Sequence, residues 1–317
     1  MKAADPNPDI TVYFNGRYMR LGDANVNILT HALHYGTGVF EGIRAYWSAE
    51  QHEMYLFRAE EHYSRWKSNC GIIRIKVGET ARELCGITAE LCRRNGFHEN
   101  VYVRPLAFKS APRVGVQPDD RDSMAIIAIP FGVYLDSEKG LHAGVVSWRR
   151  VEDNAIPGRA KICGAYVNSA LAGDEARRNG FDEAIFLTES GHVAEGATCN
   201  IFMVRKGQLV TPPPSDNILE GLTRDSVMQL ARREMRLEVV ERSIDRSEMY
   251  VCDELFFTGT AVEVGPITQV DHRPVGDGTI GKTTARLRQL YADAVRGGMD
   301  SYQHWLLPAG MGVAAPA

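Results

Sequence analysis

Three short segments of the chain carry residue types that could act together on one substrate. Lys161 follows a proline–glycine break, and Glu195 lies 34 residues further along the chain. The segment 221–223 (Gly-Leu-Thr) has the composition of a helix start, where N–H groups and the helix dipole attract phosphate. Pyridoxal-phosphate chemistry requires an amine for a Schiff base, an acid for the pyridine nitrogen and a phosphate-binding site.

Lys161 is the favoured Schiff-base residue among only eight lysines in the chain. Such an amine must be partly desolvated, so that some of it is neutral at working pH. Lys161 is flanked by small and apolar residues, whereas Lys139 and Lys206 lie in polar stretches. A solvated lysine and a solvated turn glutamate are the alternatives for Lys161 and Glu195 taken singly, and their joint spacing favours the catalytic interpretation.

Two further segments could contact a phosphate. Residues 258–261 (Thr-Gly-Thr-Ala) follow the apolar run 254–257 and could offer N–H groups and a hydroxyl at a strand end. Arg58, between a predicted strand and a predicted helix, could add a planar guanidinium. The alternatives are an ordinary threonine-capped helix at Thr223 and a solvated arginine at position 58.

Composition places the chain among ordinary globular proteins. Its 317 residues include 44% hydrophobic and 24% charged residues, which is long and apolar enough for two domains. The net charge of −4 argues against a nucleic-acid partner, which would require a basic stripe. Acidic substrates would have to be held by a few local arginines.

No segment resembles a membrane span or a secretory signal. The stretch 1–8 lacks an apolar core, and the longest apolar stretch, 124–135, is broken by Pro130 and Gly132 and is shorter than the roughly 20 residues of a membrane helix. We therefore expect a soluble, cytoplasmic protein without a membrane partner.

Cysteines and histidines give no metal pattern. The six cysteines are scattered without a C-x-x-C pair, which favours free thiols in a reducing compartment. His31 and His34 could share a metal, but no second ligand pair accompanies them. A structural role is the expectation, and no metal is predicted.

Turn residues and hydrophobic periodicity predict a mixture of helices and strands. Asn15-Gly16 predicts the turn of a β-hairpin over 11–21, and a second strand pair is expected between 44 and 57. The strand over 124–131 is continuous enough to be buried on both faces. Helices are predicted over 59–71, 79–94 and 166–178, near Thr223 and near Lys282, and strands over 100–108, from 144, and over 183–188, 200–204 and 208–211.

These elements indicate an α+β protein of two domains. A polar stretch without helix or strand period begins at Gly132. We therefore predict a small N-terminal α/β domain over 1–131, a connecting loop over 132–138, and a large C-terminal domain over 139–317 that carries Lys161.

Spaced motifs identify the chain as a member of the class IV pyridoxal-phosphate-dependent aminotransferases, which have fold type IV. The residues are Glu-x-Ala-x-x-Asn-Ile-Phe from 195, Leu-x-Thr from 209 and Leu-x-Gly-Leu-x-Arg from 219. Within that family, the segments 31–44, 101–106 and 164–169 resemble the branched-chain amino-acid aminotransferases. The resemblance implies two domains with the active site at their interface, and transamination between leucine, isoleucine or valine and 2-oxoglutarate through pyridoxamine phosphate.

Carried over to matching positions, the resemblance also implies how the cofactor, pyridoxal 5′-phosphate, is held. Lys161 would bind it covalently and then move the proton between substrate and cofactor. Glu195 would pair with the pyridine nitrogen, and Tyr166 would donate to the phenolic oxygen. The phosphate would be held by Arg58, Leu222, Thr223 and Thr260.

The resemblance implies a second set of residues for amino-acid and 2-oxo-acid substrates. The α-carboxylate would be received by Tyr102 with the backbone of Thr260 and Ala261. Phe40 would line the side-chain pocket, and Arg104 would bind the distal carboxylate of glutamate or 2-oxoglutarate. Tyr35 and Val116 would enter the neighbouring subunit's site, which implies a homodimer or a higher homo-oligomer.

The role of Arg104 also follows from the residues themselves. A pocket that takes both an aliphatic side chain and a carboxylate needs a charged donor at its rim. Tyr102 lies two residues away on the same strand face. The alternative is a sheet arginine paired with a structural acid.

Two other functions compete with this interpretation. A D-amino-acid or (R)-amine transaminase would have the same fold and cofactor. Residues 276–283 satisfy the P-loop expression of a nucleotide-binding protein. The preceding residues 271–275, however, do not have the pattern of a buried strand, and Pro274 could not donate a hydrogen bond within one. A loop that enters the last helix is the favoured interpretation of that segment.

Overall fold

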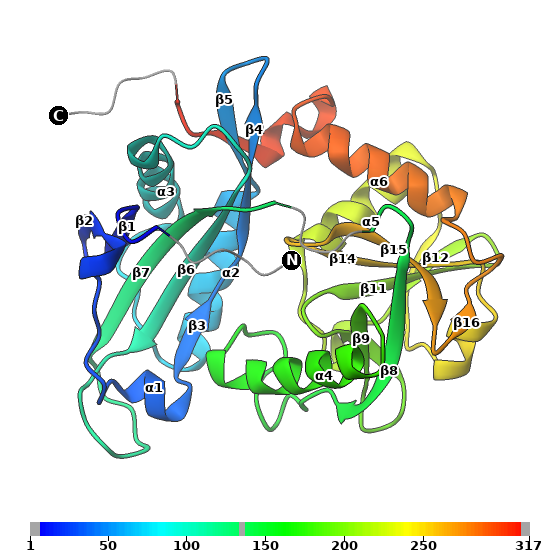
Figure 1. Ribbon diagram of the computed structural model, residues 1–317, viewed down its shortest axis with the longest axis horizontal. Coiled ribbons are helices and arrows are strands. Elements are labelled where there is room, and N and C mark those ends of the chain that lie inside the picture. Colours follow the sequence, from blue (N-terminus) through cyan, green and yellow to red (C-terminus); the bar gives the residue numbers. More distant parts are fainter. Residues whose placement is uncertain (1–6, 133–136, 312–317) are drawn as a thin grey trace. The chain divides into compact units, whose positions relative to one another are not determined.

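The computed structural model describes residues 7–132 and 137–311. By its internal contacts the chain forms two compact units (Figure 1). Unit 1 consists of Met1–Gly132, Ala160–Gly164 and Ala294–Ala317, and unit 2 of Val133–Arg159 and Ala165–Asp293. No helix in the described ranges is long and apolar enough to cross a lipid bilayer.

Unit 1 is built on one antiparallel sheet in the order β17-β5-β4-β6-β7-β1-β2, with β3 paired to β6. Helices α2 and α3 pack against each other and against this sheet (Figure 1). The strands are β1 (Thr11–Phe14), β2 (Arg17–Arg20), β3 (Gly38–Phe40), β4 (Ile43–Ser48), β5 (Glu53–Phe57), β6 (Val101–Lys109), β7 (Asp122–Pro130) and β17 (Leu306–Pro308). The helices are α1 (His31–Tyr35), α2 (Ala59–Ile72) and α3 (Ala81–Asn95).

Local sequence explains where these elements begin and end. Asn15 and Gly16 both have positive φ, 45° and 85°, as the two-residue turn between β1 and β2 requires. Thr80 and Glu83 form a capping box at the start of α3, and Gly96 ends that helix with φ 60°. The predicted hairpins and helices of this unit are therefore confirmed to within a few residues.

In the core of unit 1, helix α2 is hydrogen-bonded to β3, the strand that ends in the candidate substrate residue Phe40. Trp66 and Tyr63 are fully buried on α2. The Trp66 indole donates from Nε1 to the Val39 carbonyl across 3.0 Å. The end of β3 is thus fixed in position by the helix.

One burial prediction for unit 1 is wrong. The strand over 124–131 is not buried on both faces, because Ile127 and Ile129 of β7 are only half-buried. They pair with Arg104 and Tyr102 and therefore share a sheet face with these polar side chains. The sheet face that carries Arg104 and Tyr102 is therefore more exposed than the opposite face.

Unit 2 is built on a mixed sheet in the order β10-β9-β8-β15-β14-β11-β12-β13, with β16 paired to β15. Three pairs in it are parallel, namely β8–β9, β8–β15 and β12–β13. The strands are β8 (Leu141–Arg149), β9 (Glu183–Leu187), β10 (Val193–Gly196), β11 (Asn200–Arg205), β12 (Gln208–Thr211), β13 (Val239–Glu241), β14 (Glu254–Gly259), β15 (Glu263–Val270) and β16 (Arg273–Pro274). The helices are α4 (Tyr166–Arg178), α5 (Leu222–Glu234) and α6 (Lys282–Val295), of which the last two residues group with unit 1.

Two apolar clusters hold unit 2 together. One gathers Phe257, Met203 and Ile201 with other strand residues, and the other places Ala172 and Ala176 of α4 against Phe186. Helix α4 packs on β8 and β9, and α5 packs on β13 and β14. The segment 276–283 is a loop that enters α6, as predicted, and β16 before it is exposed.

The two units differ from the predicted domains in the placement of Lys161, which was predicted in the C-terminal domain. Residues 160–164 group with unit 1, because the Phe40 N–H donates to the Lys161 carbonyl across 3.0 Å and the Gly164 N–H to the Gly36 carbonyl across 3.1 Å. The C-terminal residues also belong to unit 1, where β17 pairs with β5. Residues 133–136 of the predicted connection lie outside the described residues, so the boundary at 132–138 stays a prediction.

Candidate active site

Lys161 is held in unit 1 by its backbone. Besides the two hydrogen bonds from Phe40 and Gly164, Ile162 forms a β-bridge with Val39. The Lys161 side chain is half-buried, and its Nζ lies 5.5 Å from the centre of the Phe40 ring. Partial burial of the amine agrees with the desolvation that a Schiff-base lysine requires.

Close backbone approach fixes this segment. Gly36 has φ 65°, and a Cβ built on it would lie 2.6 Å from the Gly164 Cα. Only glycine fits at position 36, for both reasons. The end of α1 and the segment after Lys161 are therefore packed directly against each other.

Phe40, Tyr102 and Arg104, predicted to bind substrate, lie together in unit 1. The Arg104 guanidinium donates to the Tyr102 hydroxyl across 2.9 Å, and its carbon lies 4.5 Å from the centre of the Phe40 ring. A Cβ on Gly42 would lie 2.1 Å from the Tyr102 hydroxyl, so a larger residue here would displace the Tyr102 side chain. No described carboxylate pairs with Arg104, and its Nε is buried without a partner among the described residues, which argues against the structural-acid alternative.

The carboxylate of Glu41 supports the backbone next to Phe40. Glu41 is fully buried, its N–H donates to the Pro105 carbonyl across 2.9 Å, and Arg65 donates to both carboxylate oxygens across 2.7 and 2.9 Å. Burial, the largest single effect, raises the pKa of Glu41, but the charge and hydrogen bonds of Arg65 and His62 together outweigh it and hold the pKa well below its usual range. The Phe40–Gly42 turn is thus anchored by a buried ion pair.

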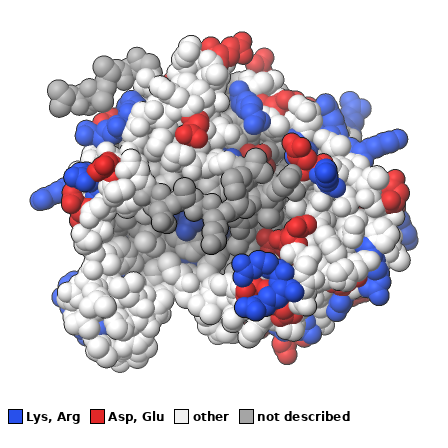
Figure 2. Space-filling model, in the orientation of Figure 1, with Lys and Arg blue, Asp and Glu red and all other residues white. Residues whose placement is uncertain are grey.

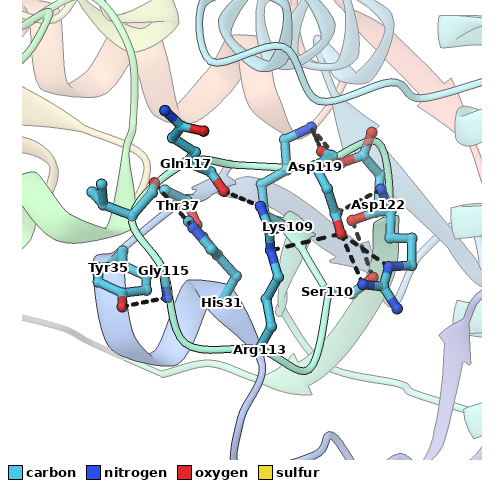
Figure 3. A network of polar contacts seen from close by, with 12 residues as sticks. His31, Tyr35, Thr37, Lys109, Ser110, Arg113, Gly115, Gln117, Asp119 and Asp122 are labelled. Atoms are coloured by element: carbon cyan, nitrogen blue, oxygen red, sulfur yellow. Dashed lines mark hydrogen bonds and ion pairs between the residues drawn. The ribbon is translucent and has the colours of Figure 1, made fainter.

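Tyr35 and the backbone of Val116 both contact His31, and Figure 3 shows Tyr35 and Gly115 next to this histidine. The Gly115 N–H donates to the Tyr35 hydroxyl across 2.9 Å, and His31 Nε2 lies 3.2 Å from the Val116 carbonyl. The other ring nitrogen of His31 contacts Thr37 Oγ1 at 2.7 Å. This histidine organises a loop, in line with the structural role predicted for it.

Arg58 is buried, so the alternative of a solvated helix-start arginine is wrong. It precedes α2 with φ 48°, and its side chain donates from Nε to Glu61 across 2.6 Å. Its guanidinium carbon lies 5.3 Å from the centre of the Trp305 ring. This packing holds the guanidinium in one place.

Glu195 lies in unit 2, at the end of β10, and is 5% exposed. Its Oε1 is 2.8 Å from an Arg150 guanidinium nitrogen, and its Oε2 accepts from Asn200 Nδ2 across 2.9 Å and from the Leu219 N–H across 3.1 Å. A buried carboxylate with a cationic partner and these donors is stabilised in its ionised form. An ionised acid is what a protonated pyridine nitrogen would need.

Asn200 connects this acid to the start of α5. Its Nδ2 also donates to the Leu219 carbonyl across 2.8 Å, and a Cβ on Gly221 would lie 2.1 Å from its Oδ1. Gly221 is the N-cap of α5 and offers no side-chain cap, so the alternative of a threonine-capped helix at Thr223 is wrong. The N–H groups of the first turn, at Leu222 and Thr223, are not capped by a side chain from position 221.

The segment after β14 lies next to the same strand as Asn200. Thr258 pairs with Asn200 in the β11–β14 ladder, and Thr260 and Ala261 form the turn that follows. The Thr258 hydroxyl is fully buried with no partner among the described residues. The orphaned hydroxyl and the helix start can donate to a phosphate, and the buried acid can accept from a protonated pyridine nitrogen. Together these groups fit a phosphorylated pyridine. Tyr166 begins α4 in the same unit and is half-buried.

The predicted residues therefore fall into two groups, each described within its own unit. Unit 1 holds Lys161, Phe40, Tyr102, Arg104, Arg58, Tyr35 and Val116, and unit 2 holds Glu195, Tyr166, Leu222, Thr223, Thr260 and Ala261. Arg150, which follows β8, was not predicted, because it lies in no motif and only its charge indicated a function. Asn200 was part of a motif, but its two hydrogen bonds became visible only in the fold.

The family model described as amino-transferase class IV matches residues 38–270. A probable branched-chain-amino-acid aminotransferase of Aquifex aeolicus is 46% identical over 297 residues, which are 93% of this chain and 96% of that protein.

Solved structures match equally broadly. The branched-chain aminotransferase of Thermoproteus uzoniensis with norvaline has a TM-score of 0.90 and 44% identity, over 95% of this chain and 99% of that one. The T.th. branched-chain amino acid aminotransferase complexed with N-(5′-phosphopyridoxyl)-L-glutamate has a TM-score of 0.89 and 40% identity, over 95% and 98% of the two chains. That relative was also solved with pyridoxamine 5′-phosphate.

Proposed function

The chain belongs to the class IV aminotransferases, and on that premise we propose that it moves the amino group of leucine, isoleucine or valine to 2-oxoglutarate in two half-reactions. It is a branched-chain-amino-acid aminotransferase, and pyridoxal 5′-phosphate is its cofactor. Bound pyridoxal phosphate supplies an electron sink for the carbanion formed at the substrate Cα.

The proposed catalytic residue is Lys161. Its amine would bind the cofactor and, once displaced by substrate, would remove the proton from the substrate Cα and return it to the cofactor. Its half-buried position supports this role, because a desolvated amine is more often neutral and can act as a base. The bonds from Phe40 and Gly164 would hold its backbone in place during both steps.

Glu195 would keep the pyridine nitrogen protonated. Its three contacts, from Arg150, Asn200 and the Leu219 N–H, hold the carboxylate in one orientation and favour its charge. This buried, fully oriented acid is the observation that supports the proposal most directly. Tyr166 would donate to the phenolic oxygen, and Arg58, Leu222, Thr223 and Thr260 would bind the phosphate.

Phe40, Tyr102 and Arg104 would bind the substrate. The Arg104 guanidinium carbon lies 5.0 Å from the centre of the Tyr102 ring as well as against Phe40, so aromatic faces stabilise the cation, and no carboxylate of the described residues pairs with it. It would therefore be available for the distal carboxylate of glutamate or 2-oxoglutarate. Tyr102, with the backbone of Thr260 and Ala261, would receive the α-carboxylate.

A donor panel against 2-oxoglutarate tests the substrate class. L-leucine, L-isoleucine and L-valine are expected to react faster than D-alanine and (R)-phenylethylamine. Faster reaction of the D-amino acid or the (R)-amine would favour the alternative transaminase and reject the proposal. Stabilisation by a nucleotide without a cofactor absorption band would favour the P-loop alternative.

We also propose that the enzyme is at least a homodimer. Four apolar side chains around α1 and its neighbouring loop are exposed: Ile28 by 81%, Leu33 by 62%, Val114 by 75% and Val116 by 71%. We call them the α1 patch. Figure 2 shows few charges on the lobe formed by α1 and this loop. A contiguous exposed apolar surface is typical of an interface, and Tyr35 and Val116 would reach from it into the other subunit's site.

Sedimentation equilibrium tests the dimer. Ile28→Glu combined with Leu33→Glu is expected to lower the mass of the particle to that of one chain and to reduce activity. Val251→Glu is the matched control, because Val251 is another apolar residue, 65% exposed, that is not a member of the α1 patch. A wild-type monomer, or a double variant with unchanged mass, would reject the proposed interface.

A cytoplasmic location is the last part of the proposal. None of the six cysteines forms a disulfide, and five of them are buried. Free thiols are typical of a reducing compartment. Fractionation of the native host's cells, with the protein detected by an antibody, would test this location.

A further inference from the structure

Arg44 is a buried cation that the proposed reaction has not yet used. It lies on β4 and is 6% exposed. One guanidinium nitrogen donates to the Phe131 carbonyl across 3.3 Å. Its Nε and its other terminal nitrogen are buried and have no hydrogen-bond partner among the described residues.

Such an arrangement is unfavourable without a compensating anion. A buried guanidinium normally pairs with a carboxylate or coordinates several acceptors, because desolvation of an unpaired charge is costly. Among the described residues, Arg44 contacts one carbonyl and two aromatic faces, with its guanidinium carbon 4.9 Å from the Phe131 ring centre and 5.7 Å from that of Tyr46. Two buried donors that no described residue satisfies indicate that a ligand supplies the anion.

The sheet places Arg44 beside the proposed substrate residues. Arg44 is directly opposite Tyr102 in the β4–β6 pairing, so the two side chains share a face, and Arg104 is the next residue of β6 on that face. The Phe131 ring that stacks on Arg44 also lies 5.0 Å from the Tyr102 ring, centre to centre. Two cations therefore stand on one sheet face, each on aromatic rings.

We propose that Arg44 is a specificity-determining residue that, together with Arg104, attracts the distal carboxylate of the dicarboxylic substrate. This inference rests on the proposed function, which assigns that carboxylate to Arg104. In the part of the chain that the structure describes, neither arginine has a hydrogen-bond partner for its Nε, and a second cation on the same face strengthens the need for an anion there.

The aromatic contacts explain how one pocket accepts two kinds of side chain. When an aliphatic substrate is bound, both guanidinium groups stay on aromatic faces, which partly offset the absence of an anion. When a dicarboxylate is bound, the free donors form charge-assisted hydrogen bonds. Arg44 thus favours the dicarboxylate without excluding the branched-chain acid.

The test is binding of two unreactive probes to the holoenzyme by isothermal titration calorimetry. Glutarate has the two carboxylates of the dicarboxylic substrate, and 4-methylvalerate has one carboxylate and a branched aliphatic end. Arg44→Met is expected to raise the Kd of glutarate about tenfold or more, the effect of losing a charged hydrogen bond, while the Kd of 4-methylvalerate stays within about twofold. Arg44→Lys, which keeps the charge, is expected to restore part of the glutarate affinity.

Controls separate the possible causes. Arg94→Met removes a guanidinium that stacks on Tyr18 at 4.5 Å and is paired with Glu90, and this variant is expected to change neither affinity. If Arg44→Met does not fold, Arg44→Gln keeps a polar donor and removes the charge.

Equal weakening of both probes, or no change for glutarate, would overturn the inference. The variant Arg104→Met distinguishes a failure of this inference from a failure of the proposed function. If it weakens glutarate and the Arg44 variants do not, only the role of Arg44 is rejected. If it leaves glutarate unchanged, the assignment of the distal carboxylate to Arg104 is wrong.

Discussion

Asn200 donates from one amide nitrogen to both the Glu195 carboxylate, across 2.9 Å, and the Leu219 carbonyl, across 2.8 Å. One side chain therefore fixes the acid proposed for the pyridine nitrogen relative to the helix start proposed for the phosphate. Asn200 is itself 4% exposed, so neither bond competes with solvent. Both ends of the proposed cofactor site in unit 2 depend on this amide.

Asn200→Ala is accordingly expected to weaken cofactor binding. The substitution removes one of the two donors to Glu195 Oε2 and the amide donor to the buried Leu219 carbonyl, so the Kd for pyridoxal phosphate should rise about tenfold or more. Fluorescence titration of the apoenzyme would measure it. The control is Asn25→Ala, which removes an exposed amide bonded to Gly22 in unit 1. Unchanged affinity in Asn200→Ala would show that the amide does not organise the site.

Arg150→Gln is expected to lower kcat about tenfold to a hundredfold while the KM for leucine changes little. The physical reason is that Glu195 loses the cation 2.8 Å from its Oε1, so its charge, and with it the protonation of the pyridine nitrogen, is less favoured. The pH dependence of the cofactor's absorption should shift as well, and Arg150→Lys should recover part of the rate. Arg149→Gln, at the neighbouring exposed position, is the control. A pure loss of thermal stability, with kcat and absorption unchanged, would make Arg150 merely structural.

Gly36→Ala is expected to displace the Lys161 segment. The residue has φ 65°, which costs a non-glycine residue about 1–3 kcal/mol, and the added methyl would meet the Gly164 Cα at 2.6 Å. Activity and melting temperature should both fall. Gly71→Ala is the matched control, because Gly71 lies in α2 with open space around a built Cβ, and this variant should be as stable as the wild type or more so. Equal behaviour of the two variants would contradict the close-packing argument.

Acid sensitivity of unit 2 is expected from Glu248. Hydrogen bonds from Arg242, with burial opposing them, lower the pKa of Glu248 from 4.5 to about 2. A carboxyl whose pKa is lower in the folded state stabilises the fold above its unfolded pKa, and this contribution is lost as the pH falls through the folded value. The wild type should therefore lose stability relative to Glu248→Gln between about pH 4.5 and pH 2. Urea unfolding at several pH values would measure this, and a pH-independent difference would contradict it.

Local signals in the sequence predicted most elements but not how distant segments meet. Asn15-Gly16 and Gly96 determine a turn and a helix end by their own backbone preferences, so they could be placed without the fold. The grouping of Lys161 with the N-terminal residues depends on a hydrogen bond from Phe40 and a bridge at Val39, neither of which has a periodic pattern. The return of β17 to β5 escaped prediction for the same reason.

The candidate site was predicted through spaced motifs, and the residues that orient it were not. Glu195 and Thr223 lie in such motifs, whereas Arg150 reaches Glu195 from the end of β8, 45 residues earlier in the chain. Likewise, Arg44 and Tyr102 become neighbours only through strand register. Contacts of this kind are set by tertiary packing, which a single sequence does not display.

Lys161 as the residue that binds pyridoxal phosphate is the central claim. Borohydride reduction of the purified holoenzyme, followed by peptide mass spectrometry, tests it most directly. The cofactor mass is expected on the peptide that contains Lys161, while Lys161→Ala should fold, remain colourless and show no transamination. Lys206→Ala, in an exposed turn, should keep both colour and activity. A cofactor found on another lysine, or a Lys161→Ala protein that still transfers amino groups, would contradict the account.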